Sequence, residues 1–422
     1  MSVAMTHRDT CRLCESGDVE LVLPLAPSAI ADAFVPGERL DEPQEAYPLD
    51  VYLCRSCGHV QLLDVLDPEA LFANYIYTTQ GSPGLQEHFA AYADELVERT
   101  GDPARRPAVD IGSNDGSLLR LLQAKGFTVH GVDPARDIAA RASDSGIPTT
   151  AAFFDRDVAA RLRDEHGPAA VITANNVFAH ADDLGGIASG IADLLAPDGM
   201  FVFEVSYLLD TVQNMVFDYV YHEHLAYHAV KPMRSFLARH GMELFDVRRI
   251  PTKGGSIRGF AQLAGGPRVA TGAPGALVAE EDAAGLDDPD TYSGWAERID
   301  AARAETRRVL ADAVRDGARI AGFGASATGT TLMHHFGLDD FVTLIVDDNP
   351  DRQGLYSPGH HVPVVSPDVL YEDDGPSHTV VLAWRFAEPI ARNHAGYLER
   401  GGTFVVPLPE VRILDSATAR TP

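Results

Sequence analysis

A short stretch near residue 110 limits the possible folds of this chain more than any other part. Residues 107–111 are mostly apolar, glycines follow at positions 112 and 116, and a leucine-rich segment begins at residue 118. This order predicts a β-strand, a tight turn and a helix. Glycine carries no Cβ, so the backbone at Gly112 and Gly116 can approach a ligand closely. The N-terminus of the helix then offers unpaired N–H groups to polar groups of that ligand.

The acids around this turn indicate which ligand it binds. The next predicted strand, residues 128–133, ends in Asp133, and in doubly wound sheets an acid at this place holds ribose hydroxyls. The spacing Asp-x-Gly-x-x-x-Gly begins at Asp110, and this carboxylate would repel the pyrophosphate of a dinucleotide. The turn instead resembles the first motif of class I S-adenosylmethionine-dependent methyltransferases, with Asp110 beside the methionine end. An ordinary glycine turn in an α/β domain is the alternative.

Strand and helix patterns alternate from about residue 107 to residue 265, with further strands expected at 169–173 and 200–205. The carboxyl ends of parallel strands line the crevice of such a sheet. Phe153, at the third strand tip, is expected either to stack on adenine or to belong to the core, and His180 to reach the reacting centre. The residues predicted to bind the cofactor are Asp110, Gly112, Asn114, Gly116, Asp133, Phe153, Asn175 and Asn176.

All four cysteines of the chain fall in two Cys-x-x-Cys pairs, Cys11 with Cys14 and Cys54 with Cys57. Zinc takes four thiolates tetrahedrally, and a two-residue spacer points both sulfurs of a pair at one ion. Disulfides are the alternative, which a reducing compartment disfavours. A site closed by four thiolates has no open coordination position, so the predicted zinc is structural and not catalytic.

The charge balance excludes one class of partner. Lys and Arg number 34 against 61 Asp and Glu, which gives a formal net charge of −27. A field of this sign repels phosphate backbones and argues against a nucleic-acid substrate.

The sequence shows neither a secretory segment nor an apolar run long enough for a bilayer. We therefore expect a cytoplasmic protein without a membrane partner, and we expect a monomer.

The densest polar cluster of the chain is the segment 218–228, which contains Tyr221, His222, Glu223 and His224. A catalytic site is the favoured interpretation. A His-x-His metal site is an alternative, although no third ligand stands at a recognisable spacing. A polar surface loop is the other alternative, and the number of aromatic residues argues against it.

Several motifs together resemble the sugar C-methyltransferases of deoxysugar antibiotic pathways. These motifs are the cysteine pairs, the Asp-Ile-Gly-Ser-Asn-Asp-Gly turn, the segment 175–180, the Tyr-His-Glu-His cluster and the segment 254–258, in this order. Enzymes of that family methylate a nucleotide-linked 4-keto-deoxysugar at carbon 3. The resemblance implies S-adenosylmethionine as cofactor and a sugar linked to deoxythymidine diphosphate (dTDP) as substrate.

The chemistry of such a reaction needs a base and a group that stabilises an enolate. The ketone acidifies the neighbouring C–H, and the enolate then attacks the sulfonium methyl. The family pattern implies His224 as base, with Glu223 orienting or polarising it. Tyr221 and His180 are candidates for the enolate oxygen or the sugar hydroxyls. Further pocket residues are expected to be Tyr75, which would close the pocket, Tyr77 and His222.

Two glycine-containing turns in the second half of the chain are candidates for substrate phosphates. In the first, residues 252–260, Lys253, Ser256 and Arg258 are predicted to contact the diphosphate, and a hairpin turn is the alternative. The second, residues 319–329, repeats the strand, glycine turn and helix pattern. The resemblance implies that this second unit binds the nucleotide-sugar through Gly324 and Ser326 and holds no dinucleotide.

The 422 residues suffice for two or three domains. We expect an α/β protein of three parts: a zinc-bound lobe at 1–68, a class I methyltransferase Rossmann-like domain at 69–264 and a second Rossmann-like domain at 265–422. Two other functions remain open. One is an NAD-dependent oxidoreductase or epimerase that acts on a nucleotide-sugar, and the other is a non-catalytic zinc adaptor.

Overall fold

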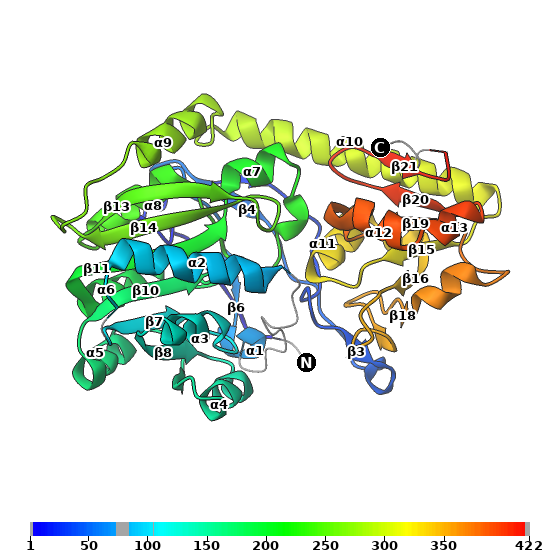
Figure 1. Cartoon of the computed structure of the whole chain (residues 1–422). Helices are drawn as coiled ribbons and strands as arrows, with labels where there is room; N and C mark the ends of the chain where they lie inside the picture. The colour runs from blue at the N-terminus through cyan, green and yellow to red at the C-terminus, as the bar shows by residue number, and fades with distance from the viewer. Residues whose placement is uncertain (1–2, 73–83, 104, 418–422) are drawn as a thin grey trace.

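The computed structural model describes residues 3–72, 84–103 and 105–417. Tyr75 and Tyr77 lie outside the described residues, so their roles stay predictions. Figure 1 shows two α/β units side by side, joined along one edge by the long helix α10 (Pro289–Arg315). The α/β class is the predicted one. No helix among the described residues is both long and apolar enough to cross a membrane.

The first unit is a seven-stranded sheet with the order β13-β14-β11-β10-β7-β8-β9. The strands from β11 to β9 run parallel, and the antiparallel strand β14 separates them from β13. The strands are β7 (Pro107–Ile111), β8 (Thr128–Asp133), β9 (Thr149–Ala151), β10 (Ala169–Asn175), β11 (Leu195–Ser206), β13 (Met242–Ile250) and β14 (Ser256–Leu263). All four predicted strand positions of this unit therefore contain strands.

Helices cover both faces of this sheet. Side chains of a strand alternate between its faces, so successive apolar residues pack against different helices. Ala108 and Val171 pack in one cluster with α2 and α3, whereas Val109 and Ile172 pack in the other with α5 and α6. The helices of this unit are α2 (Leu85–Thr100), α3 (Ser117–Ala124), α4 (Arg136–Asp144), α5 (Arg156–His166), α6 (Leu184–Leu194), α7 (Leu208–Gln213) and α8 (Val230–Arg239). The polar strand ends between the two clusters form the site described below.

The N-terminal lobe contributes a four-stranded antiparallel sheet in the order β12-β5-β4-β2. Its strands are β2 (Val19–Leu23), β4 (Val51–Cys54), β5 (Val60–Leu62) and β12 (Ala226–Tyr227). The last of these comes from the middle of the chain, directly after the predicted catalytic cluster. A second pair joins β1 (Met5–His7) to β6 (Asp64–Leu66), and the short helix α1 (Pro68–Phe72) follows.

The C-terminal unit is a six-stranded sheet with the order β18-β16-β15-β19-β20-β21, preceded by α9 (Ala273–Ala283) and α10. All strands are parallel except the last. They are β15 (Ile320–Phe323), β16 (Val342–Val346), β18 (Val364–Val365), β19 (His378–Val381), β20 (Thr403–Val406) and β21 (Arg412–Leu414), with helices α11 (Ala327–Phe336), α12 (Ala387–Asn393) and α13 (Ala395–Glu399). The N-terminal lobe reaches this unit too, because β3 (Val35–Pro36) pairs with β17 (Leu355–Tyr356).

Candidate active site

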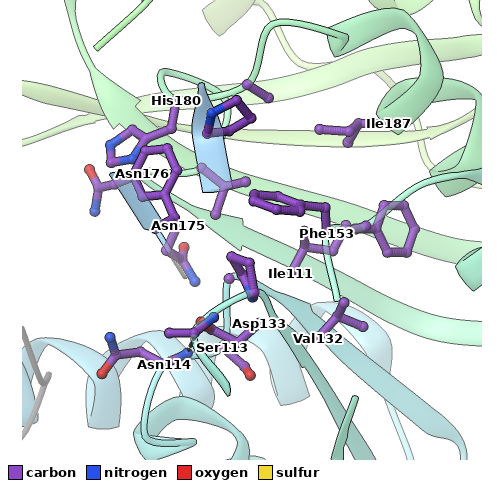
Figure 2. A pocket seen from close by; sticks show the side chains of 18 of the residues that line it. Ile111, Ser113, Asn114, Val132, Asp133, Phe153, Asn175, Asn176, His180 and Ile187 are labelled. Atoms are coloured by element: carbon purple, nitrogen blue, oxygen red, sulfur yellow. Dashed lines mark hydrogen bonds between the residues drawn. The ribbon is translucent and has the colours of Figure 1, made fainter. Parts of the chain in front are cut away.

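A cavity of about 580 Å³ opens at the carboxyl ends of β7, β8, β10 and β11. The loop between β9 and α5 closes one side of the cavity, and α1, α2 and the segment 221–225 close the others. Figure 2 shows Ser113, Asn114 and Asp133 on one wall, with Asn175, Asn176 and His180 on another. The sheet therefore brings together residues as far apart in the sequence as Ser113 and His180.

Asp133 fixes the turn that follows the first strand. Its Oδ2 accepts a hydrogen bond from the backbone N–H of Asn114 at 2.8 Å, and its Oδ1 accepts one from Ala135 at 2.9 Å. Burial raises the pKa of Asp133, and these two bonds oppose the shift. The predicted acid at the strand tip thus lies at the cavity, where it also holds the glycine turn in place.

Asp110 also lines the cavity and is buried. Its carboxylate accepts a hydrogen bond from Thr173 Oγ1 at 2.6 Å. Burial raises the pKa of Asp110 to about 7, with a smaller contribution from Asp133 and an opposing one from Thr173. A cation placed beside this carboxylate would favour its ionised form.

The two glycines of the turn are required mainly by packing. Gly112 has φ +68°, and a Cβ there would lie 2.4 Å from a methyl group of Val177. Gly116 has φ +74°, and a Cβ there would lie 2.9 Å from Ile147. Gly112 lines the cavity, whereas Gly116 precedes α3 and does not. The sequence predicts close approach of a ligand at both glycines, but only Gly112 of the two faces the cavity.

The walls of the cavity carry polar groups that have no protein partner. Both side-chain amide atoms of Asn175 and the hydroxyl of Ser113 are buried without a hydrogen-bond partner among the described residues. Buried polar groups normally have partners, so these atoms fit a bound polar ligand. Phe153 is 37% exposed at the edge of the same cavity (Figure 2), where an aromatic face can stack on a planar ring. Asn175 and Phe153 are therefore suited to a nucleoside cofactor.

His224 has a defined tautomer. Its Nδ1 lies 2.8 Å from the carbonyl oxygen of Tyr219, and a carbonyl can only accept, so Nδ1–H donates. The ring packs against Tyr221 with the centroids 4.1 Å apart. Burial lowers the pKa of His224 to about 4, helped by the nearby charge of Lys253 and opposed by the bond to Tyr219. At neutral pH the Nε2 atom therefore carries no proton and can accept one.

His180 lies beside His224, with the two ring centroids 5.0 Å apart. On its other side it stacks on Phe72 of α1 at 5.5 Å. Burial holds the pKa of His180 well below its usual value, and His224 and Lys253 add to this shift. The cavity thus contains two neighbouring imidazoles that are both neutral at neutral pH.

Lys253 supplies a positive charge to the same cavity. It follows β13 with φ +54°, an uncommon conformation for a residue with a side chain, in the tight turn that leads to β14. The side chain faces the cavity, so solvent reaches it although protein groups surround it. This environment lowers the pKa of Lys253 to about 8, and Glu204 opposes the shift. The amine is therefore mostly protonated at pH 7.

The structure corrects two of the predicted site residues. Glu223 is buried but does not line the cavity, and the partner of the His224 imidazole is the carbonyl of Tyr219 rather than this carboxylate. Burial raises the pKa of Glu223 to about 7, and Asp32 adds to the shift. Arg258 is not free to contact a diphosphate, because its side chain is 2% exposed and pairs with Glu95 and Glu204.

Other predicted substrate residues also have local partners. Ser256 Oγ donates to the carbonyl of Thr252 at 3.0 Å, and Ser326 caps the N-terminus of α11 by accepting from the N–H of Gly329. Gly324 has φ +104° and packs against Ala383. None of these residues lines the cavity. His222 does line it, although its Nε2 lies 3.3 Å from the carbonyl of Tyr47.

Sequence reasoning missed two ionisable residues at the cavity. Glu204 at the end of β11 and His88 of α2 both line it, and His88 Nε2 lies 2.9 Å from the Glu204 carboxylate. An acid inside the apolar pattern Phe-Val-Phe-Glu-Val was a usable signal for Glu204. His88 stands in an ordinary amphipathic helix and gave no such signal.

The four cysteines form one cluster, as predicted. Their sulfurs lie within 4.8 Å of one another and form no disulfide. The Sγ atoms of Cys11 and Cys57 are 3.7 Å apart and those of Cys14 and Cys54 are 3.5 Å apart. Tetrahedral zinc with Zn–S bonds of ~2.3 Å requires sulfur separations of roughly 3.8 Å. The cluster therefore fits the zinc ion.

Comparison with known proteins identifies the family. Three family models match successive segments: a zinc binding domain at residues 11–72, a methyltransferase domain at 85–246 and a C-methyltransferase C-terminal domain at 251–409. The C-methyltransferase NovU of Streptomyces niveus is 33% identical over 409 residues, which cover 97% of this chain and 97% of NovU.

Solved structures with detectable likeness include methyltransferases that cover less than half of this chain. The magnesium protoporphyrin IX methyltransferase from Synechocystis PCC 6803 with bound SAM is 18% identical, covers 42% of this chain and 78% of its own, and has a TM-score of 0.31. A methyltransferase from Clostridium acetobutylicum ATCC 824 is 13% identical, covers 42% and 92%, and has a TM-score of 0.34. The family matches and the identity to NovU along nearly the whole length show that this chain belongs to the C-methyltransferase family and is a zinc-binding, S-adenosylmethionine-dependent C-methyltransferase.

Proposed function

We propose that this C-methyltransferase methylates carbon 3 of a dTDP-linked 4-keto-deoxysugar. The observation that supports this most is the fixed tautomer of His224, which presents an unprotonated Nε2 in the cofactor cavity. The order of motifs in the sequence resembles that of sugar C-methyltransferases, and the name of NovU states the same reaction class. A carbon acid next to a ketone is the substrate type that such a base requires.

His224 would remove the proton from carbon 3. Its pKa of about 4 in the free protein makes it a weak base, chiefly because it is buried and secondarily because Lys253 is close. An anionic substrate would raise this pKa, since its charges offset that of Lys253. We infer that substrate binding strengthens the base at the moment of use. The carbonyl of Tyr219 would then stabilise the imidazolium through the Nδ1–H bond.

The enolate oxygen and the sugar hydroxyls would contact the remaining polar groups of this end of the cavity. Tyr221, His180 and His222 line it, and Lys253 offers the positive charge that an enolate or a diphosphate needs. S-adenosylmethionine supplies the electrophilic methyl group when bound. Asp110, Asn175 and Phe153, which also line the cavity, would hold it. Tyr75 and Tyr77 remain proposed as pocket residues.

The setting of the reaction is part of the proposal. Four thiols at a zinc site require a reducing compartment, which supports the cytoplasm. The formal charge of −27 disfavours nucleic acid as a partner. We propose that the enzyme acts as a monomer.

The proposal is tested with purified protein, S-adenosylmethionine and a panel of dTDP-linked 4-keto-deoxysugars. The expected result is a product heavier by one CH2, with the new methyl group placed on carbon 3 by nuclear magnetic resonance. Methylation on oxygen or nitrogen, or no methylation of any member, would refute it. A change in nicotinamide absorbance on turnover would instead support the oxidoreductase alternative.

A further inference from the structure

The zinc site and the candidate catalytic histidines are joined by one buried arginine. Arg12 stands between Cys11 and Cys14, and its side chain is fully shielded from solvent. It does not line the cavity. Its guanidinium nevertheless reaches the two loops that carry His180 and His224.

The hydrogen bonds of this guanidinium connect separate parts of the chain. Nη1 donates to the carbonyl of Leu62 in β5 at 2.7 Å and to the carbonyl of Leu225 at 2.8 Å, and it also lies 3.1 Å from Gln61 Oε1. Nη2 donates to Asp182 Oδ1 at 3.1 Å. Leu225 directly follows His224, and Asp182 lies two residues after His180. One side chain thus anchors both histidine loops.

The two loops are also bonded to each other beside this arginine. The N–H groups of Leu225 and Ala226 both donate to the carbonyl of Ala179, at 2.7 and 3.1 Å. The N–H of Leu62 donates to the carbonyl of Leu225 at 3.0 Å, where β12 joins β5. The separation of 5.0 Å between the rings of His180 and His224 therefore depends on a junction that Arg12 completes.

We propose that Arg12 is a positioning residue, which transmits the geometry of the zinc knuckle to His180 and His224. Cys11 precedes Arg12, and Cys14 follows Leu13. Because both cysteines bind the metal, the knuckle fixes the backbone on each side of Arg12. The planar guanidinium then serves four acceptors from three segments at once. A lysine ammonium has the charge but not the fork geometry, so it cannot replace this set of bonds. The proposal rests on the proposed roles of the two histidines.

The test compares Arg12→Lys with Arg239→Gln in the full-length zinc protein. Arg239 of α8 also donates to this knuckle, through the carbonyl of Leu13, but it contacts neither histidine loop. It therefore controls for general loosening of the knuckle. Zinc content, S-adenosylmethionine affinity, kcat and KM are measured, together with the ¹⁵N signals of the His224 imidazole, which report its tautomer.

In Arg12→Lys we expect full zinc content and unchanged cofactor affinity, with kcat lowered by roughly 10- to 100-fold because small misplacements of catalytic groups are costly. The His224 signals should change from a single Nδ1-protonated tautomer to an average of two. Arg239→Gln should match the wild type in both respects. Wild-type kcat and tautomer in Arg12→Lys, or equal losses in the two variants, would overturn the proposal.

If Arg12→Lys does not bind zinc, a second variant tests the proposed positioning role of Arg12. Asp182→Ala removes one anchor, the side-chain acceptor of Arg12, at a side chain that is 43% exposed, so it should leave the fold and the zinc intact. Its kcat should fall by about 3- to 10-fold, and the ¹⁵N signals of His180 should shift. Unchanged kcat and signals would refute the proposal. The imidazole signals need no substrate, so a wild type that methylates no sugar would refute the proposed function without affecting this result.

Discussion

The Nδ1 atom of His224 lies 2.8 Å from the carbonyl oxygen of Tyr219. This bond decides which ring nitrogen of His224 can act as a base. The acceptor is a backbone atom, so no substitution of the Tyr219 side chain removes it. Replacing His224 itself is therefore the direct way to remove the base.

His224→Asn should lower kcat by about 100- to 10,000-fold, the usual contribution of a general base. The affinity for S-adenosylmethionine should not change, because the proposed cofactor contacts are with Asp110, Asn175 and Phe153. Steady-state kinetics and calorimetric titration measure the two quantities on the same preparation. A turnover near that of the wild type would contradict the assignment.

Asp110 should make cofactor binding depend on pH. Its pKa is raised to about 7 by burial, so between pH 3.8 and about 7 the folded state keeps a proton that the unfolded chain releases. This carboxyl therefore lowers stability as pH rises through that window. Binding of the cofactor ammonium favours the ionised carboxylate, so affinity should increase, by about 3- to 10-fold, from pH 6 to pH 7.5. Calorimetry across this range is the measurement, and Asp110→Asn should show a weaker and flatter dependence.

Lys253→Met should weaken substrate binding more than it slows chemistry. The variant removes the cavity cation, whose pKa is lowered to about 8 because the surrounding protein groups desolvate the ammonium. We expect KM for the nucleotide-sugar to rise about tenfold, with a smaller fall in kcat, whereas Lys253→Arg should retain most of the affinity. Because the folded-state pKa is below the usual lysine value, this group makes stability rise with pH above about 8, and the methionine variant should lose that rise. An unchanged KM in Lys253→Met would exclude a substrate contact.

Arg258→Ala should destabilise the fold by about 3–5 kcal/mol, because it removes the one fully buried cation that pairs with both Glu95 and Glu204 among the described residues. The other partners of these carboxylates, Arg99, Arg248 and His88, are more exposed. The guanidinium also lies 3.7 Å above the ring of Tyr92. Arg248→Ala is the matched control, since Arg248 pairs with the same Glu95 but is 47% exposed. The control should cost less than about 1 kcal/mol. Urea unfolding measures both values, and equal values would show that Arg258 is not the centre of this network.

Removal of zinc should lower the stability of the protein, and the loss of turnover should follow from this loss of stability. A chelator, or Cys14→Ser, is expected to lower the melting temperature and to abolish turnover, because the lobe that positions the histidine loops loosens. Replacement of zinc by cobalt should restore both, with the absorption spectrum of a four-thiolate site. Retention of full activity by a metal-free protein of unchanged stability would refute a structural role.

The sequence predicted well those parts of the site that depend on local patterns. The strand, glycine turn and helix at residues 107–124, the acid Asp133 and the four-cysteine cluster are all present. Each follows from spacing within a few residues or from a ligand set of known geometry. Asn175, Asn176 and His180 line the cavity, because they lie at or just after the end of a parallel strand, and their roles in binding stay predictions.

The errors concern contacts between distant segments. The neutralising partners of Arg258, Glu204 and Glu95, are 54 and 163 residues away, and strand alternation does not say which face of β14 meets them. Glu223 was expected to orient His224 because it is adjacent in sequence, yet the backbone turns the two side chains to different neighbours. The two-residue strand β12 is too short to show any periodicity.

The pairing of β12 with β5 has a consequence for biosynthesis. Until residue 226 has left the ribosome, the edge of β5 in the N-terminal lobe has no neighbour, although the cysteines that bind zinc were all translated about 170 residues earlier. The sheet of the N-terminal lobe is thus completed only after residue 226 of the 422 has been translated, with an exposed strand edge open to intermolecular pairing in the meantime. A fragment that stops at the zinc lobe would carry that open edge permanently, so the lobe is a poor candidate for expression or transplantation on its own.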